Sequence, residues 1–254
     1  MNNPPTILTI IPARFASSRL PGKPLADLGG KPMIVRVYEQ AQKITGLNRL
    51  IVATDDERIA QAVQQAGGEA ELTRDDHPSG SDRVWEVAQR HPDFDWILNL
   101  QGDEPLINPD NVAHLLTKAQ QTPHWDVMTL VSPLSQSEAF YNPNTVKAVM
   151  TTQGRVLYCS RAPIPHNRTS NQAKTGTIEG AYRHIGLYLF KREALNRFTK
   201  TPPSPLELRE SLEQLRFLEM GLSLYATVVA DAHSGVDTPD DLHRIAGLFV
   251  NLEY

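Results

Sequence analysis

The sequence from Ile7 to Pro24, ILTIIPARFASSRLPGKP, predicts a buried strand followed by a basic loop of small residues. The run Ile7–Ile11 is typical of a strand covered on both faces in a parallel sheet. Pro12 ends that strand, and the loop after it carries Arg14, Arg19 and Lys23 without an acidic side chain. Backbone N–H groups and fixed cations at the end of a first strand suit a polyphosphate. A solvated basic loop without a ligand is the alternative that the spacing leaves open.

Composition limits the classes of protein. The 254 residues are enough for one large α/β domain or two small ones. A net charge of −4 argues against a nucleic-acid binder, because binding a duplex backbone needs a basic face. Cys159 is the only cysteine, which excludes disulfides within the chain and zinc sites made of thiolates. No apolar run reaches the roughly 18 residues of a spanning helix, and the N-terminus lacks a signal-peptide pattern, so we expect a cytoplasmic protein without membrane insertion.

Strand-like and helix-like segments alternate through the first half of the chain. Strands are predicted over 7–11, 50–54, 69–72, 96–100 and 127–131, and helices over 33–41, 55–66, 82–90 and 109–120. This alternation favours right-handed crossovers. The predicted fold class is therefore α/β, with a mostly parallel sheet flanked by helices.

The pattern changes from about residue 142. Strands are predicted over 146–150, 156–160 and 182–190 without long helices between them, so 142–200 is interpreted as a β-rich insertion in a single domain spanning 1–254. This smaller subdomain is a candidate surface for dimer contact. Ser204-Pro205-Leu206-Glu207 is a capping box that predicts one helix ending at Gly221. A last strand over 222–229 and a final helix from Thr238 to about Val250 complete the chain.

Two aspartates are candidates for a metal site beside the basic loop. Hard cations such as Mg²⁺ prefer one or two carboxylates plus phosphate oxygens. Asp103 follows a buried strand directly after Gly102, so we expect it to face the same crevice as the loop after the first strand. Asp237 precedes a helix cap, where the helix dipole favours an ionised carboxylate. Either aspartate can instead have a purely local role in a turn or helix start, and spacing alone does not bring the two together.

Several other polar residues have open interpretations. His184 lies inside a predicted strand, where a histidine is more often structural than catalytic, and Tyr188 shares its face if the strand is regular. Arg161 follows a strand. Glu213 and Gln214 lie on or beside the polar face of a helix, and such a face is usually only solvated.

A set of short motifs resembles one known family over nearly the whole chain. The motifs are Ile10-Ile11-Pro12-Ala13-Arg14, Arg19-Leu20-Pro21-Gly22-Lys23-Pro24-Leu25, Ala53-Thr54-Asp55, His77-Pro78-Ser79-Gly80-Ser81-Asp82-Arg83, Gln101-Gly102-Asp103-Glu104-Pro105, Asn142-Pro143-Asn144, Tyr158-Cys159-Ser160-Arg161, Arg183-His184-Ile185-Gly186-Leu187-Tyr188, Leu212-Glu213-Gln214-Leu215-Arg216 and Gly235-Val236-Asp237-Thr238-Pro239. Together they are similar to the 3-deoxy-manno-octulosonate cytidylyltransferases, the CMP-Kdo synthetases of lipopolysaccharide assembly. Two departures stand out. Ser81-Asp82 replaces the more usual Thr-Glu, which is expected to alter the base or sugar pocket, and the segment 167–180 matches poorly.

The resemblance implies a glycosyltransferase-A-like nucleotidyltransferase fold, Mg²⁺, a homodimer, and conversion of CTP and Kdo to CMP-Kdo and pyrophosphate. It implies that Lys23, Arg14, Arg19, Asp103 and Asp237 are catalytic, with the two aspartates holding the metal. Around the nucleotide it places Pro12, Ala13, Arg14, Arg19, Lys23, Ser79, Gly80 and Arg83. Around the sugar acid it places Gln101, Arg161, His184, Tyr188, Glu213 and Gln214, most of them in or near the 142–200 insertion.

Three alternatives to this interpretation remain at this stage. The same chemistry on another acidic sugar, such as 8-amino-Kdo or a sialic acid, is not separated by the motifs. A non-catalytic nucleotide-binding module is disfavoured by the presence of Lys23 with both aspartates. A dinucleotide oxidoreductase is disfavoured because no Gly-x-Gly-x-x-Gly follows the first strand.

Overall fold

A computed structural model describes residues 4–16, 20–134, 137–166, 168, 178, 180–230, 235–236 and 238–250. They fall into two compact units, the first within 1–113 and 233–254 and the second within 114–232. Each unit is described by itself. The 142–200 insertion lies within the second unit, and its role in sugar binding or dimer contact stays a prediction.

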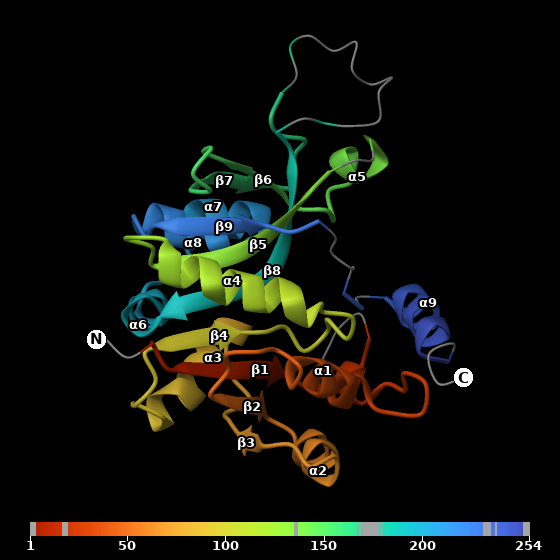
Figure 1. Ribbon diagram of the computed structural model, residues 1–254. Coiled ribbons are helices and arrows are strands. Elements are labelled where there is room, and N and C mark those ends of the chain that lie inside the picture. Colours follow the sequence, from red (N-terminus) through yellow and green to blue (C-terminus); the bar gives the residue numbers. More distant parts are fainter. Residues whose placement is uncertain are drawn as a thin grey trace. The chain divides into compact units, whose positions relative to one another are not determined.

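The first unit is built on four parallel strands in the order β3-β2-β1-β4, which lie side by side in Figure 1. These are β1 (Ile7–Ala13), β2 (Arg49–Thr54), β3 (Ala70–Leu72) and β4 (Trp96–Asn99). β1 pairs with β2 on one side and β4 on the other, and the side chains of its apolar run are buried, as predicted. The residues that follow β1 and β4 therefore lie at the same edge of this sheet.

Helices of the first unit begin where the sequence offers caps. They are η1 (Lys23–Leu25), α1 (Met33–Ala41), α2 (Glu57–Gln65), α3 (Gly80–Arg90) and α9 (Pro239–Val250), and α4 (Pro109–Gln121) begins there. Asp56 caps α2 through the N–H of Arg58, and Ser79 caps α3, which begins at Gly80, two residues before its predicted start. α3 packs against β1, β2 and β4. Val236 and α9 share a small apolar core with Leu28 and Met33.

The second unit centres on β5 (Val127–Pro133), which pairs antiparallel with β8 (Tyr182–Lys191) and parallel with β9 (Leu224–Val228). β6 (Lys147–Met150) pairs antiparallel with β8 and with β7 (Val156–Ser160). The helices are α5 (Ser137–Tyr141), α6 (Arg192–Lys200), α7 (Pro205–Glu210) and α8 (Gln214–Glu219). The predicted α/β class, with a mostly parallel sheet flanked by helices, is confirmed. No helix of the described residues is long and apolar enough to cross a bilayer.

The single helix predicted from Pro205 to Gly221 is wrong. The capping box at Ser204 is present, but α7 ends at Glu210, Ser211 takes the left-handed conformation at φ 53°, and α8 starts at Gln214. Long-range contacts explain the break. Arg161 binds the carbonyl oxygens of Glu210 and Ser211 at 2.7 and 3.4 Å. These bonds satisfy polar groups at the end of α7, where a helix leaves its last carbonyls unpaired.

Candidate functional site

A pocket of about 280 Å³ lies at the carboxyl edge of the first unit's sheet. Its volume is near the lower end of the range for small-molecule sites. The lining residues come from the loop after β1, η1, the start of α1, the start of α3 and the loop after β4. They are Pro12, Ala13, Arg14, Lys23, Pro24, Met33, His77, Pro78, Ser79, Gly80, Arg83, Gln101, Gly102 and Asp103. The pocket thus brings together all the described residues that were predicted around the nucleotide, with Gln101 and Asp103.

The floor of the pocket depends on a close approach of two strand ends. A Cβ atom at Gly102 would lie 2.7 Å from the carbonyl oxygen of Pro12, a distance that real side chains do not adopt. Glycine at this position therefore lets the backbone after β4 contact the backbone at the end of β1. The following residue, Asp103, is carried to the pocket by this approach.

Lys23 and Asp103 form an ion pair within the pocket. Gly22 takes the left-handed conformation at φ 69° and starts η1, which places Lys23 at its first position. The Nζ atom of Lys23 donates to Oδ2 of Asp103 at 2.6 Å. The Lys23 side chain is 12% exposed and that of Asp103 is 34% exposed, so the lysine is the more enclosed partner. The lining of the pocket therefore includes a lysine and a carboxylate in direct contact with each other.

The start of α3 forms another wall of the pocket. The Ser79 hydroxyl accepts from the N–H of Asp82, and Gly80 packs close to the Pro12 ring, where an added Cβ would lie 3.4 Å from Cγ. An eleven-residue helix presents its N-terminus, the positive end of its dipole, at this wall. Such a terminus beside a lysine favours an anionic ligand.

Arg83 joins three loops around the pocket. Its Nη1 donates to Oγ1 of Thr73 at 2.6 Å and its Nη2 to Oδ2 of Asp55 at 3.2 Å. The other Asp55 oxygen accepts from the N–H of Phe15 at 3.3 Å. Arg83 is only 3% exposed. These bonds fix the loops after β1, β2 and β3 to one another, and direct binding of a nucleotide by Arg83 stays a prediction.

The unusual Ser81-Asp82 pair lies just behind the start of α3. Ser81 is fully buried and its hydroxyl accepts from Nδ2 of Asn99 on β4 at 3.2 Å. Asp82 accepts from the Ser79 hydroxyl at 2.6 Å. Neither residue lines the pocket. The pair therefore supports the helix start and the strand beside it.

The segment before α9 is attached to the Asp103 loop. The N–H of Val236 donates to the carbonyl oxygen of Asp103 at 2.9 Å. A Cβ atom at Gly235 would lie 3.1 Å from the same oxygen, so the contact is tight. Asp237, the next residue along the chain, lies outside the described residues, as do Arg19 and most of the segment 167–180.

The chemistry of the pocket fits a hard divalent cation. No group of three or more His, Cys, Asp or Glu side chains able to hold a metal occurs within the described parts of the chain. Mg²⁺ does not require one, since it is commonly held by one or two carboxylates plus phosphate oxygens. Asp103 supplies such a carboxylate next to the lysine and the helix terminus. A metal carried in with a polyphosphate is compatible with this set of donors.

Three of the residues predicted around a sugar acid gather in the second unit. His184 and Tyr188 lie on β8 with ring centroids 5.6 Å apart, and the Tyr188 hydroxyl donates to Oε1 of Gln214 at 3.1 Å. β8 is not regular here, because Thr129 pairs with Tyr188 while Leu130 pairs with Ile185. The bulge adds two residues to β8, so side chains on either side of it keep alternating between the two faces of the sheet. His184 and Tyr188 therefore still share a face.

The residues His184, Tyr188 and Gln214 form a polar cluster, and burial sets the protonation of its titratable members. It lowers the pKa of His184 to about 4 and raises that of Tyr188 well above 10. Nε2 of His184 lies 3.1 Å from the Thr129 hydroxyl. Cys159 is fully buried, and burial raises the pKa of its thiol to about 12. At neutral pH the cluster therefore offers uncharged hydrogen-bonding groups.

The other predicted sugar residues have different surroundings. The Arg161 guanidinium donates to the carbonyl oxygens of Pro143, Glu210 and Ser211, which is a structural arrangement. Glu213 occupies the position before α8. Gln101 belongs to the first unit and donates to Oδ1 of Asn99 at 3.5 Å. Gln101 lines the pocket of the first unit, whereas no contact described here assigns Arg161 or Glu213 to a ligand.

Residue-level reasoning missed one residue that lines the pocket and one that holds the surrounding loops together. His77 was given no role in ligand binding, yet it lines the wall beside Ser79. Asp55 was assigned no role, yet it joins Arg83 to the loop after β1. Both residues belong to the short motifs that carry the family resemblance, which is the only signal in the sequence that singles them out.

Comparison with protein families gives a match to the cytidylyltransferase family model over residues 8–224. Proteins named 3-deoxy-manno-octulosonate cytidylyltransferase align along almost the entire chain. The one from Syntrophotalea carbinolica is 45% identical over 243 residues, which cover 94% of this chain and 97% of the relative. The one from Escherichia coli is 45% identical over 239 residues, with 94% of each chain covered.

Solved structures agree with these sequence matches. The structure of CMP:2-keto-3-deoxy-manno-octonic acid synthetase complexed with CTP has a TM-score of 0.90 and 44% identity, covering 97% of this chain and 99% of that one. A cytidylyltransferase from Leptospira borgpetersenii has a TM-score of 0.61 at 15% identity, covering 93% of this chain and 83% of that one. At that identity the likeness concerns the fold alone.

Proposed function

This chain belongs to the 3-deoxy-manno-octulosonate cytidylyltransferase family, and on that premise we propose that it transfers CMP from CTP to the sugar acid Kdo, releasing pyrophosphate. The product, CMP-Kdo, is an activated sugar for lipopolysaccharide synthesis. The observation that carries the proposal is the pocket of the first unit, where Lys23, Asp103 and the start of α3 meet. A cation, a carboxylate and a helix N-terminus are the groups that a metal-bound triphosphate needs.

Mg²⁺ is the proposed metal, and Asp103 and Asp237 are its proposed ligands. The oxygen donors of the pocket support this choice, and the bond from Val236 to Asp103 supports pairing the two aspartates, because Val236 precedes Asp237. When bound, the ion lowers the pKa of a coordinated hydroxyl and neutralises phosphate charge. The hydroxyl that gains most is the anomeric hydroxyl of the sugar acid, which is a poor nucleophile when protonated.

Lys23 exchanges partners during substrate binding in this proposal. Without phosphate it neutralises Asp103 at 2.6 Å, which keeps an enclosed ammonium group paired. With a metal-bound triphosphate in the pocket, Asp103 would serve as a ligand of the metal, and Lys23 would donate to the phosphates instead of to Asp103. With Arg14 and Arg19 it then stabilises the charge that develops on the leaving pyrophosphate. A preorganised donor of this kind is typically worth on the order of 3 kcal/mol in the transition state.

The helix terminus and the glycines hold the nucleotide in place. Ser79 and Gly80 form the wall at the start of α3, next to Pro12 and Ala13 at the end of β1. Close backbone approach at these positions allows a ligand to be bound by main-chain N–H groups. Arg83 supports this wall through its bonds to Thr73 and Asp55. Arg83 is therefore expected to aid nucleotide binding mainly by holding the surrounding loops in place.

The sugar acid is proposed to contact the polar cluster of the second unit, together with Arg161 and Glu213 of that unit. A role of Gln101, which belongs to the first unit, in sugar binding stays a prediction. The uncharged His184, Tyr188 and Gln214 offer hydrogen-bond donors and acceptors to hydroxyl groups. Tyr188→Phe removes only the phenolic oxygen. This variant is expected to raise the KM for Kdo while leaving the KM for CTP unchanged, and equal changes in both would remove Tyr188 from the sugar site.

The test of the proposed function is pyrophosphate release from CTP, measured with Kdo, 8-amino-Kdo and a sialic acid side by side. Release that depends on both CTP and Kdo, and is fastest with Kdo, is the expected result. Faster release with either other sugar acid would retain the chemistry and reassign the substrate. Absence of release with every sugar, in a sample that binds CTP, would favour a non-catalytic nucleotide-binding module.

A homodimer is the proposed assembly. β7 pairs only with β6 among the described strands, and its Leu157 side chain is 59% exposed. An edge strand with an exposed leucine is a surface that association would cover. Light scattering should give twice the mass of the chain, and Leu157→Asp should shift the protein toward the monomer. A monomeric wild-type protein would contradict this assignment.

A further inference from the structure

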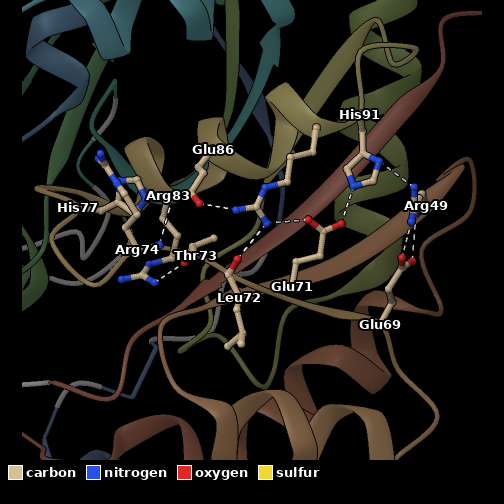
Figure 2. Close-up of polar contacts among 11 residues, drawn as sticks. Arg49, Glu69, Glu71, Leu72, Thr73, Arg74, His77, Arg83, Glu86 and His91 are labelled. Atoms are coloured by element: carbon tan, nitrogen blue, oxygen red, sulfur yellow. Dashed lines mark hydrogen bonds and ion pairs between the residues drawn. The ribbon is translucent and has the colours of Figure 1, made fainter.

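A chain of side chains joined by hydrogen bonds and ion pairs runs through α3, β3 and β2 of the first unit (Figure 2). It starts at His77, which lines the pocket, and continues through Glu86 and Arg90 of α3 to Glu71 of β3. From Glu71 it passes through His91 and Arg49 to Glu69. Only the His77 end reaches the pocket lining.

Glu86 holds the loop that leads into the pocket wall. Its Oε2 lies 2.5 Å from Nε2 of His77 and accepts from the backbone N–H of Arg74 at 3.2 Å. Its Oε1 pairs with Arg90 one turn further along α3. The His77 side chain is only 6% exposed. One carboxylate thus fastens two points of the segment 74–77, and Pro78 and Ser79 follow directly at the pocket.

The carboxylate is held in its ionised form. Burial by itself would raise the pKa of Glu86, but the hydrogen bonds from His77 and from the N–H of Arg74, with the charge of Arg90, hold that pKa below its ordinary value of 4.5. Hydrogen bonds to an ionised carboxylate are stronger than those between neutral groups. The loop is therefore fixed to α3 at neutral pH.

Glu71 provides an internal comparison. It also binds a histidine through Nε2, at 2.5 Å to His91, and it also pairs with Arg90, at 3.0 Å. The two carboxylate side chains are almost equally exposed, at 21% for Glu86 and 20% for Glu71. His91, unlike His77, is not part of the pocket lining. The two glutamates therefore differ mainly in which segment they hold.

We propose that Glu86 is a positioning residue of the nucleotide pocket, which acts by fixing His77 and the Arg74 backbone so that Pro78 and Ser79 keep their place at the pocket wall. This inference rests on the proposed binding of CTP. Glu86 does not line the pocket, so it serves the site through the loop alone. Its loss weakens CTP binding and leaves the chemical step intact.

The experiment compares Glu86→Gln with Glu71→Gln in the full-length protein. CTP affinity is measured by calorimetry with Mg²⁺ present, and KM for CTP and kcat are measured by pyrophosphate release with Kdo. Glu86→Gln should weaken CTP binding and raise KM about tenfold, the equivalent of one lost charge-assisted hydrogen bond, with kcat within about twofold. Glu71→Gln should lose similar thermal stability but bind CTP like the wild type.

His77→Gln gives a second route to the same interaction and leaves Glu86 in place, should Glu86→Gln fail to fold. It should also raise the Kd for CTP with little change in kcat. Wild-type affinity in Glu86→Gln or His77→Gln, or an equal loss of affinity in Glu71→Gln, would overturn the proposal. Failure of the wild type itself to bind CTP would instead overturn the proposed function.

Discussion

The N–H of Val236 donates a hydrogen bond of 2.9 Å to the carbonyl oxygen of Asp103. This bond joins the loop after β4 to the segment before α9, two parts of the chain that are far apart in sequence. Val236 is fully buried among Leu28, Met33 and residues of α9, which fixes its side of the bond. The position of Asp103 therefore depends on packing near the C-terminus as well as on β4.

Gly235→Ala should lower turnover because it disturbs this junction. A Cβ atom at Gly235 would lie 3.1 Å from the Asp103 carbonyl oxygen and 3.2 Å from Oε1 of Glu104, so the Asp103 loop must shift by a few tenths of an ångström. Misplacement of a catalytic group costs rate steeply, and we expect kcat to fall about tenfold. Steady-state kinetics checks this.

Gly247→Ala in α9 is the control for that substitution. Its added Cβ meets no atom within 4 Å, and alanine favours helix over glycine by up to about 1 kcal/mol. Unchanged turnover is expected. A Gly235→Ala enzyme as active as Gly247→Ala would show that the junction does not position Asp103.

Lys23→Ala should weaken CTP binding and lower kcat together. The change removes the cation proposed to bind the phosphates and leaves the Asp103 carboxylate without this ion pair. The expected loss of rate is about a hundredfold. Lys31→Ala is the matched control, because Lys31 pairs with Glu39 at 2.7 Å on a more exposed surface outside the pocket lining. An unchanged CTP dissociation constant in Lys23→Ala would contradict the role of this lysine.

His184 should make the protein less stable in mild acid. Its folded pKa is about 4 against an ordinary value of 6.5, so the unfolded chain binds the extra proton between these two values. The free energy of unfolding should therefore fall as the pH drops from 6.5 toward 4, by up to about 3 kcal/mol.

Urea unfolding at pH 7 and pH 5 tests this assignment. His184→Gln should lose less stability between the two pH values than the wild type, because glutamine does not titrate. His114→Gln, at an exposed position of α4, should behave as the wild type does. Equal acid sensitivity in His184→Gln and the wild type would disprove the assignment.

Two buried strand threonines should respond in opposite directions to valine. Thr9 on β1 is fully buried, and its hydroxyl has no hydrogen-bond partner in the described structure. Thr9→Val should raise the free energy of unfolding by about 1 kcal/mol, because an unsatisfied polar group is replaced by an apolar one of similar shape.

Thr129 on β5 is also fully buried, but its hydroxyl lies 3.0 and 2.8 Å from the carbonyl oxygens of Ile185 and Leu187 at the bulge. Thr129→Val should lower the free energy of unfolding by about 1–3 kcal/mol. Denaturant titration measures both changes, and a loss of stability in Thr9→Val would contradict the account of that residue.

The sequence predicted those strands and helix starts that depend on residues close together in the chain. The apolar run Ile7–Ile11 became the central strand, and the capping box at Ser204 starts α7. The break at Ser211 could not be predicted, because it depends on Arg161, which is distant in sequence. The leucines at 208, 212, 215 and 218 keep helical spacing across the break, so the sequence pattern gave no sign of it.

In the candidate site, too, the sequence predicted the features set by strand ends but not those set by contacts between distant side chains. The basic loop, Gly102 and Asp103 were predicted to lie at one sheet edge, since strand ends of a parallel sheet meet there. The ion pair between Lys23 and Asp103 was not predicted, nor was the link from Asp55 to Arg83. Both depend on side chains from separate loops, whose distances no spacing in the sequence encodes.

The central claim is that Asp103 and Asp237 hold the metal that activates the sugar hydroxyl against CTP. Its most direct test is pyrophosphate release by Asp103→Asn and Asp237→Asn over a Mg²⁺ titration, with CTP binding measured on the same samples. The account predicts that both variants bind CTP and lose turnover by at least about a hundredfold. Wild-type turnover in either variant at ordinary Mg²⁺ concentration would contradict it.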